Sequence, residues 1–108
     1  MTSITVIKED NRIIAFTCNG HAEYAKESED IVCAAISMLV INTINSIEAL
    51  TSTKPIVETE QKSGYIHCSF EEDITDDAAL LLDSMILGLS QIKEQYGIKY
   101  IDVKIKEV

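Results

Sequence analysis

The chain has 108 residues, of which 46% are hydrophobic and 25% are charged. This length fits one globular domain over residues 1–108, and four Gly and one Pro leave little sequence for linkers. Nine Lys and Arg against 18 Asp and Glu give a net charge of −9, which argues against a surface that binds nucleic acid. The longest apolar run, residues 31–41, is too short to cross a bilayer, and no secretion signal is visible. We therefore expect a cytoplasmic protein with reduced thiols and no membrane partner.

The first half of the chain predicts a hairpin, a loop and a helix. Residues 3–8 and 12–18 are rich in Ile, Val, Thr and Phe, which favour strands, and a polar turn at 9–11 separates them. Residues 22–29 are polar and aperiodic, so we expect a loop there. Residues 30–50 carry few polar positions in their first turns and predict a helix that is buried in the core.

The second half predicts another hairpin, a capped helix and a last strand. Residues 56–60 and 65–70 form the hairpin, and alternation over 101–105 indicates a half-buried strand. Thr75 is expected to cap the helix and Gly97 to end it. Its apolar face is expected to contain Ala78, Leu81, Met85, Leu89, Ile92 and Tyr96. The order ββαββαβ predicts an α+β fold with two helices packed on a mostly antiparallel sheet.

Cys33 is the first candidate for chemistry. We expect it in the first turn of the helix, after a cap at Ser28 or Asp30, where the helix dipole favours the reactive thiolate. The alternative is that Cys33 is a small core residue, as buried cysteines commonly are.

His21 is the second candidate, because it follows Gly20 at the end of a predicted strand, upstream of Cys33. An imidazole within reach of a thiol could take its proton, as nucleophilic catalysis requires. A solvated turn histidine is the alternative. Gly20 is expected to supply a turn conformation beside it.

The remaining polar and sulfur-containing residues are expected either to support Cys33 and His21 or to have structural roles. Ser37 lies four residues after Cys33 on the same helix face and could bond near the thiolate or to its own helix. Asp30 could cap the helix or orient His21. Cys18 is expected to point inward with Ile14 and Phe16, Cys68 is also expected in the core, and His67 is expected on a solvated face. No metal-ligand spacing or nucleotide-binding motif is present, so we expect neither a metal nor a cofactor.

Two blocks of sequence resemble the ribosomal-processing cysteine proteases called Prp. They are Gly-His-Ala at 20–22 and Asp-Ile-Val-Cys-Ala-Ala-Ile-Ser at 30–37. The resemblance implies that Cys33 is the nucleophile and His21 the general base. It also implies a homodimer that removes the N-terminal extension of the large-subunit ribosomal protein L-twenty-seven. The acidic loop at 22–29 has no glycine, unlike many members of that family, and we expect it to form a mobile lid over the thiol.

Two other classes of function remain open at this point. Cys33 could be a redox-sensing thiol, with Cys18 as its resolving partner. The chain could also be a non-catalytic interaction module in ribosome assembly, in which the two sequence blocks serve packing.

Overall fold

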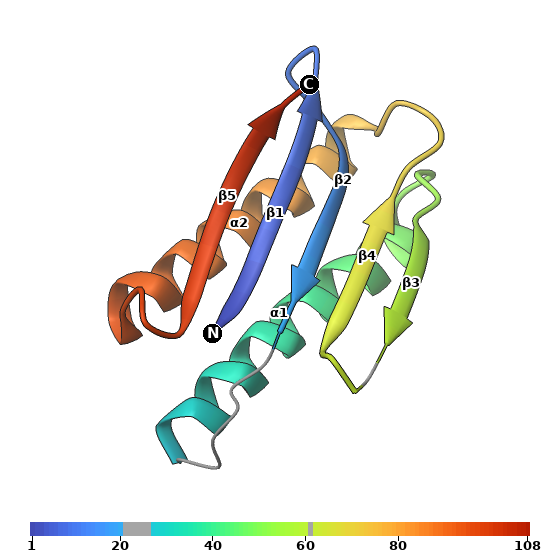
Figure 1. Cartoon of the computed structure of the whole chain (residues 1–108). Helices are drawn as coiled ribbons and strands as arrows, with labels where there is room; N and C mark the ends of the chain where they lie inside the picture. Colours follow the sequence, from blue (N-terminus) through green and yellow to red (C-terminus); the bar gives the residue numbers. More distant parts are fainter. Residues whose placement is uncertain (21–26, 61) are drawn as a thin grey trace.

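The computed structural model describes residues 1–20, 27–60 and 62–108, with the backbone alone for residues 27–30. Its elements follow the order ββαββαβ, as predicted (Figure 1). The five strands and two helices are β1 (Thr2–Glu9), β2 (Arg12–Asn19), α1 (Glu27–Leu50), β3 (Ile56–Glu60), β4 (Tyr65–Ser69), α2 (Asp76–Tyr96) and β5 (Ile101–Glu107).

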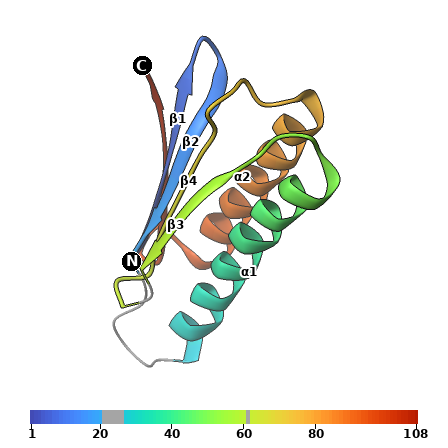
Figure 2. The same cartoon turned by 90° about the vertical axis from the view of Figure 1, so that its right-hand side faces the viewer.

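The strands form one five-stranded sheet in the order β3-β4-β2-β1-β5. The β1–β5 pair is parallel, and the other three neighbouring pairs are antiparallel. Both helices lie side by side on the same face of this sheet (Figure 2). The α+β prediction with a mostly antiparallel sheet is therefore confirmed.

The core fills the space between the sheet and the two helices. Phe16, Val6 and Ile4 are fully buried on the strands, and Leu82 and Met85 meet them from α2. Because a Phe or Leu side chain contributes roughly 1.5–3 kcal/mol when it is fully buried, this layer supplies most of the apolar stabilisation.

Strand β2 contains a bulge that changes which side chains point inward. The β1–β2 register shifts after Ile7, which pairs with Ala15, while Lys8 pairs with Ile13. Ile14 is the extra residue and is half-buried, whereas Ile13 is 5% exposed and belongs to the core. The prediction that Ile14 shares the inward face with Phe16 and Cys18 was wrong, because strict alternation does not continue through a bulge.

Helix α1 begins at Glu27, three residues before the predicted start. The prediction of a loop was therefore wrong for residues 27–29, and residues 22–26 lie outside the described part of the chain. Ser28 and Asp30 fall inside the first turn, so neither is the N-cap residue. Acidic residues in a first turn are stabilised by the helix dipole, so the polarity of this segment did not oppose a helix.

Only one face of α1 is buried, although we predicted a helix buried in the core. Val32, Ile36 and Val40 face the core, whereas Met38 and Ile41 on the opposite side are 66% and 46% exposed. By length and composition α1 could cross a membrane, but the core helix of a soluble protein passes the same test. Helix α1 therefore has exposed apolar side chains on its outer face, in addition to the apolar face that packs on the core.

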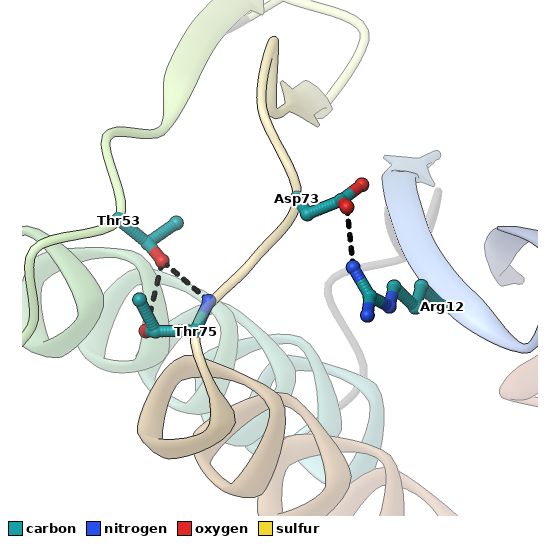
Figure 3. A network of polar contacts seen from close by, with 4 residues as sticks. All are labelled: Arg12, Thr53, Asp73 and Thr75. Atoms are coloured by element: carbon teal, nitrogen blue, oxygen red, sulfur yellow. Dashed lines mark hydrogen bonds and ion pairs between the residues drawn. The ribbon is translucent and has the colours of Figure 1, made fainter.

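Helix α2 begins and ends where predicted. The Thr75 side chain accepts a hydrogen bond from the Ala78 N–H, and Gly97 ends the helix with a φ of 102°. The Oγ1 atom of Thr53 accepts a hydrogen bond of 3.0 Å from the Thr75 N–H and lies 3.0 Å from Thr75 Oγ1 (Figure 3). These contacts fasten the start of α2 to the segment between α1 and β3. Beside them Arg12 forms an ion pair with Asp73.

On α2 the buried face is shifted slightly from the predicted one. Ala78, Met85 and Leu89 are buried as expected, but Leu82 is fully buried while Leu81 is half-buried. Since neighbouring helical positions are 100° apart, a small rotation of the helix decides which of two adjacent leucines reaches the core.

Candidate active site

Cys33 borders a cavity of about 360 Å³ where α1, the end of β2 and the β3–β4 hairpin meet. The thiol-bearing residue is half-buried, so it is neither enclosed in the core nor fully in solvent. The described residues that line the cavity are Thr2, Cys18, Gly20, Cys33, Ile36, Ser37, Ile41, Thr59, Glu60, Gly64, Tyr65 and Ile66. Cys33 is therefore placed where an external molecule can reach it.

The position of Cys33 within α1 differs from the prediction. Because α1 begins at Glu27, Cys33 lies in the second turn and not in the first. The N–H groups that lack a partner inside the helix belong to residues 27–30, one turn before Cys33. Helical side chains tilt toward the N-terminus, so the Cys33 side chain still leans toward that end. The prediction that Cys33 lies in the first turn, where the helix dipole would favour its thiolate, was therefore wrong.

Two of the predicted supporting residues, Ser37 and Gly20, line the same cavity as Cys33. Gly20 has a φ of 91°, and a Cβ atom there would lie 2.7 Å from the Met1 carbonyl oxygen. Both the backbone conformation and this close approach require glycine. Gly20 therefore fixes how the chain leaves β2 at the edge of the cavity.

The other predicted site residues are only partly described. His21, the predicted base, lies outside the described residues. The backbone of Asp30 is in the first turn of α1, and its side chain is also outside the described part. Within the described ranges, no group of three or more His, Cys, Asp or Glu side chains could hold a metal ion.

The cysteines differ in their surroundings, and none of them forms a disulfide in the described structure. Burial raises the pKa of the Cys18 thiol to about 11, and the nearby Cys33 adds to the effect. Burial alone raises the pKa of Cys68 to about 12. Both strand cysteines therefore stay protonated near neutral pH, which is the unreactive state of a thiol. The prediction that they are core residues is confirmed.

We expect iodoacetamide to modify Cys33 before Cys18 or Cys68 in the folded protein. At pH 8, a thiol with a pKa near 11 is ionised in only about one molecule in a thousand, and burial also blocks access. Raising the pH toward 11 should ionise part of the Cys18 thiol, while most of the Cys68 thiol stays protonated because its pKa is about 12. Peptide mapping by mass spectrometry after timed labelling measures the order. Faster labelling of Cys18 or Cys68 at pH 8 would contradict this assignment.

The β3–β4 hairpin supplies cavity residues that the sequence did not reveal. Thr59 and Glu60 come from β3, and Tyr65 and Ile66 come from β4. They reach the cavity because β4 pairs with β2, which places Ile66 opposite Cys18. The hairpin itself was predicted, but no local signal in the sequence showed which strand it would join.

His67 has partners that the prediction of a solvated residue did not include. Its Nδ1 atom lies 2.9 Å from Thr17 Oγ1 in a hydrogen bond. Its ring is stacked with that of Tyr65, with an interplanar angle of 8° and centroids 6.5 Å apart. The imidazole is half-buried and is not among the described residues that line the Cys33 cavity.

Comparisons with known proteins agree with this arrangement. The family model of the cysteine protease Prp matches residues 1–102. The ribosomal processing cysteine protease Prp of Bacillus subtilis is 30% identical over 91 residues, which cover 81% of each chain. The Staphylococcus aureus protein of the same name is 29% identical over 91 residues, or 84% of this chain and 86% of its own.

Solved structures show the same fold. Prp from S. aureus in complex with a substrate peptide has a TM-score of 0.89 and 27% identity, covering 98% of this chain and 100% of its own. The S. aureus structure with a covalently linked product peptide has a TM-score of 0.88 and 28% identity, with the same coverage. A Streptococcus mutans protein reaches 0.89 at 26% identity over 100% of this chain and 96% of its own. The match along nearly the whole chain, together with the shared fold, shows that the chain belongs to the Prp family of cysteine proteases.

Proposed function

We propose that this protein is an endopeptidase of ribosomal processing, formed by a single catalytic domain over residues 1–108. Its substrate is the large-subunit ribosomal protein L-twenty-seven in its N-terminally extended form, and its product is the mature protein. The observation that carries the proposal is the half-buried Cys33 thiol on a cavity of about 360 Å³, while the other two thiols are held in the core. The relatives named for ribosomal processing, and the peptide-bound S. aureus structures, support the choice of substrate.

In the proposed mechanism His21 takes the proton from the Cys33 thiol, and the thiolate attacks the carbonyl carbon of the scissile peptide bond. The tetrahedral intermediate collapses as the C–N bond breaks, and the protonated His21 gives its proton to the leaving amine. Water, activated by His21, then attacks the thioester and releases the acid product and the free thiol. This sequence consumes one water molecule and needs no metal or redox cofactor.

The remaining site residues support this Cys–His pair. Gly20 sets the backbone geometry directly before His21, and no side chain can replace its hydrogen without contacting the Met1 carbonyl. Ser37 presents a hydroxyl to the cavity one helical turn after Cys33. The proposed pair is a dyad without a third member; the backbone of Asp30 lies on the helical turn that precedes Cys33.

We expect His21→Ala to lower kcat/KM for a peptide that spans the extension by about 10²–10⁴-fold, the usual contribution of a general base. Thiol acylation should slow most, because the proposed acceptor of the Cys33 proton is then removed. Stopped-flow detection of the first product measures that step directly. Cys68→Ala is the control, since Cys68 is buried away from the cavity lining and should keep near-normal turnover. Unchanged acylation in His21→Ala would remove His21 from the mechanism.

We also propose a homodimer that uses the exposed apolar face of α1. Ile31 and Met38 are 50% and 66% exposed, and their spacing of seven residues places them along one stripe of the helix. The resemblance to the family implies a homodimer, and we propose that a second copy of the same stripe covers this surface. The proposed location is the cytoplasm, with neither a membrane nor a nucleic acid as a direct partner.

Met38→Glu is expected to convert the dimer to a monomer, because it places a charge in the middle of an apolar contact. Sedimentation velocity across a range of protein concentrations measures the change. Ile105→Glu is the matched control, since Ile105 is 52% exposed on β5 and outside α1. If the wild-type protein sediments as a monomer at every concentration, the dimer proposal is wrong.

A redox-sensing role for the same thiol is less well supported than proteolysis. Such a role needs a resolving thiol, and Cys18 borders the Cys33 cavity. However, burial raises the pKa of Cys18 to about 11, so its attacking thiolate is scarce at neutral pH.

A further inference from the structure

Thr2 begins strand β1 at the end of the sheet that borders the Cys33 cavity. Its backbone N–H donates a hydrogen bond of 2.9 Å to the Tyr100 carbonyl, and the residue pairs with Ile101 of β5. On its other side, a Cβ atom at Gly20 would lie 3.8 Å from the Thr2 Cα atom. The position of Thr2 is therefore fixed by chain segments on both sides.

The Thr2 side chain points to the face of the sheet that carries both helices (Figure 2). Residues two apart on a strand share a face, and Ile4 is fully buried in the core between the sheet and the helices. Cys18 pairs with Ile4 and shares this inner face. Thr2 lines the cavity together with Cys18 and Cys33, so its side chain belongs to the floor that the sheet provides.

The Thr2 hydroxyl is a buried polar group that has no hydrogen-bond partner within the described part of the chain. The residue is only 3% exposed, and no described group bonds to its Oγ1 atom. The buried residues Thr43 and Thr53 do have partners, because their Oγ1 atoms bond to the Leu39 carbonyl and to Thr75. Since a buried hydroxyl without a partner is destabilising, the Thr2 hydroxyl calls for a partner from outside the fold.

A peptide that enters this cavity needs hydrogen-bond donors. Its backbone carbonyls leave water for a lining that is partly apolar, with Ile36, Ile41 and Ile66 among its residues. Attack by the Cys33 thiolate requires a backbone carbonyl in the cavity, so an acceptor is present there. The Thr2 hydroxyl can donate one hydrogen bond, which would satisfy two dehydrated groups at once.

We propose that the Thr2 hydroxyl donates a hydrogen bond to a backbone carbonyl of the bound substrate and so positions the peptide at Cys33. This inference rests on the proposed function, because it concerns the substrate that Cys33 cleaves. Thr2 is then a residue that binds the peptide backbone, and this contact does not depend on the side chains of the substrate.

Thr2→Val removes the hydroxyl and keeps the shape of the side chain. For a peptide that spans the N-terminal extension of ribosomal protein L-twenty-seven, we expect KM to rise about tenfold with kcat unchanged, the effect of one lost hydrogen bond. Thr2→Ser keeps the hydroxyl and should stay within about twofold of the wild-type KM. An unchanged KM in Thr2→Val, or an equal loss in Thr2→Ser, overturns the inference.

Thr5→Val is the matched control. Thr5 is half-buried on the same strand, but it pairs with Thr17 on the opposite face and does not line the described cavity. It loses the same hydroxyl and should keep the wild-type KM.

Urea denaturation without peptide distinguishes a binding role of the Thr2 hydroxyl from a structural one. Thr2→Val should unfold at the same urea concentration as the wild-type protein or at a higher one, because no hydrogen bond within the described part of the chain is lost. A lower midpoint would show that the hydroxyl stabilises the fold, which contradicts the inference.

Binding to the Cys33→Ala protein separates this inference from the proposed function. Fluorescence anisotropy with the labelled peptide should show about tenfold weaker binding when Thr2→Val is added. Replacing one backbone carbonyl at a time by a thiocarbonyl, a weaker acceptor, should identify one peptide whose loss of binding disappears in the double variant. If binding depends on Thr2 in this way but the wild-type protein cleaves nothing, the proposed function fails and the inference stands. Equal binding by the two proteins contradicts the inference even when cleavage is normal.

Discussion

Cys33→Ala is expected to lower peptide cleavage by at least about 10³-fold, the largest effect of any single substitution in this protein. The substitution removes the atom that is proposed to form the acyl-enzyme, and no other described residue offers a comparable nucleophile at the cavity. Cys18 also borders the cavity, but burial raises its pKa to about 11 and keeps it protonated. The rate of product formation under single-turnover conditions measures the loss.

Cys33→Ser refines the same test. A hydroxyl is far less acidic than a thiol, so the proposed base His21 cannot maintain a useful concentration of the anion. Cleavage should therefore remain very slow while peptide binding is kept. Cys18→Ala serves as the control for a nearby thiol that does not react. Full activity in Cys33→Ser, or a loss in Cys18→Ala as large as that in Cys33→Ala, would show that the nucleophile is wrongly assigned.

Phe16→Ala is expected to reduce the free energy of unfolding by about 3–5 kcal/mol, the usual cost of deleting a buried aromatic ring. Phe16 is 0% exposed and belongs to the core between the sheet and the helices. Domains of this kind have a total stability of roughly 5–15 kcal/mol, so the variant should be close to unfolding at moderate temperature.

Urea denaturation followed by circular dichroism measures this difference. Ile105→Ala is the comparison, because Ile105 is 52% exposed on the edge strand β5 and its truncation should cost less than about 1 kcal/mol. Equal losses in the two variants would mean that the core is not centred on Phe16.

Local signals predicted most of the fold. The Thr75 cap and the Gly97 stop of α2 depend on residues within one helical turn, so the sequence contains all the information they need. The bulge that turns Ile14 away from the core depends on the pairing of β2 with β1, and alternation alone could not reveal it. The start of α1 at Glu27 differs from the prediction because a polar, aperiodic segment favours a loop, although acidic residues also stabilise a first helical turn.

The site was predictable only in part. Helical spacing predicted that Cys33 and Ser37 share a face, and both line the cavity. Gly20 was predicted to adopt a turn conformation, and it has a φ of 91°. Glu60 and Tyr65 join the cavity through the β2–β4 pairing, which connects parts of the chain far apart in sequence. No local pattern predicts such a contact, so these residues required the structure.

The decisive measurement is the intact mass of the N-terminally extended ribosomal protein L-twenty-seven before and after incubation with the purified protein. If the proposed function is correct, the wild-type protein removes a single N-terminal segment and leaves one shorter product of defined mass. The Cys33→Ala protein should leave the substrate mass unchanged over the same period. An unchanged substrate mass with the wild-type protein would rule out this substrate, and the same shortened product with Cys33→Ala would rule out Cys33 as the nucleophile.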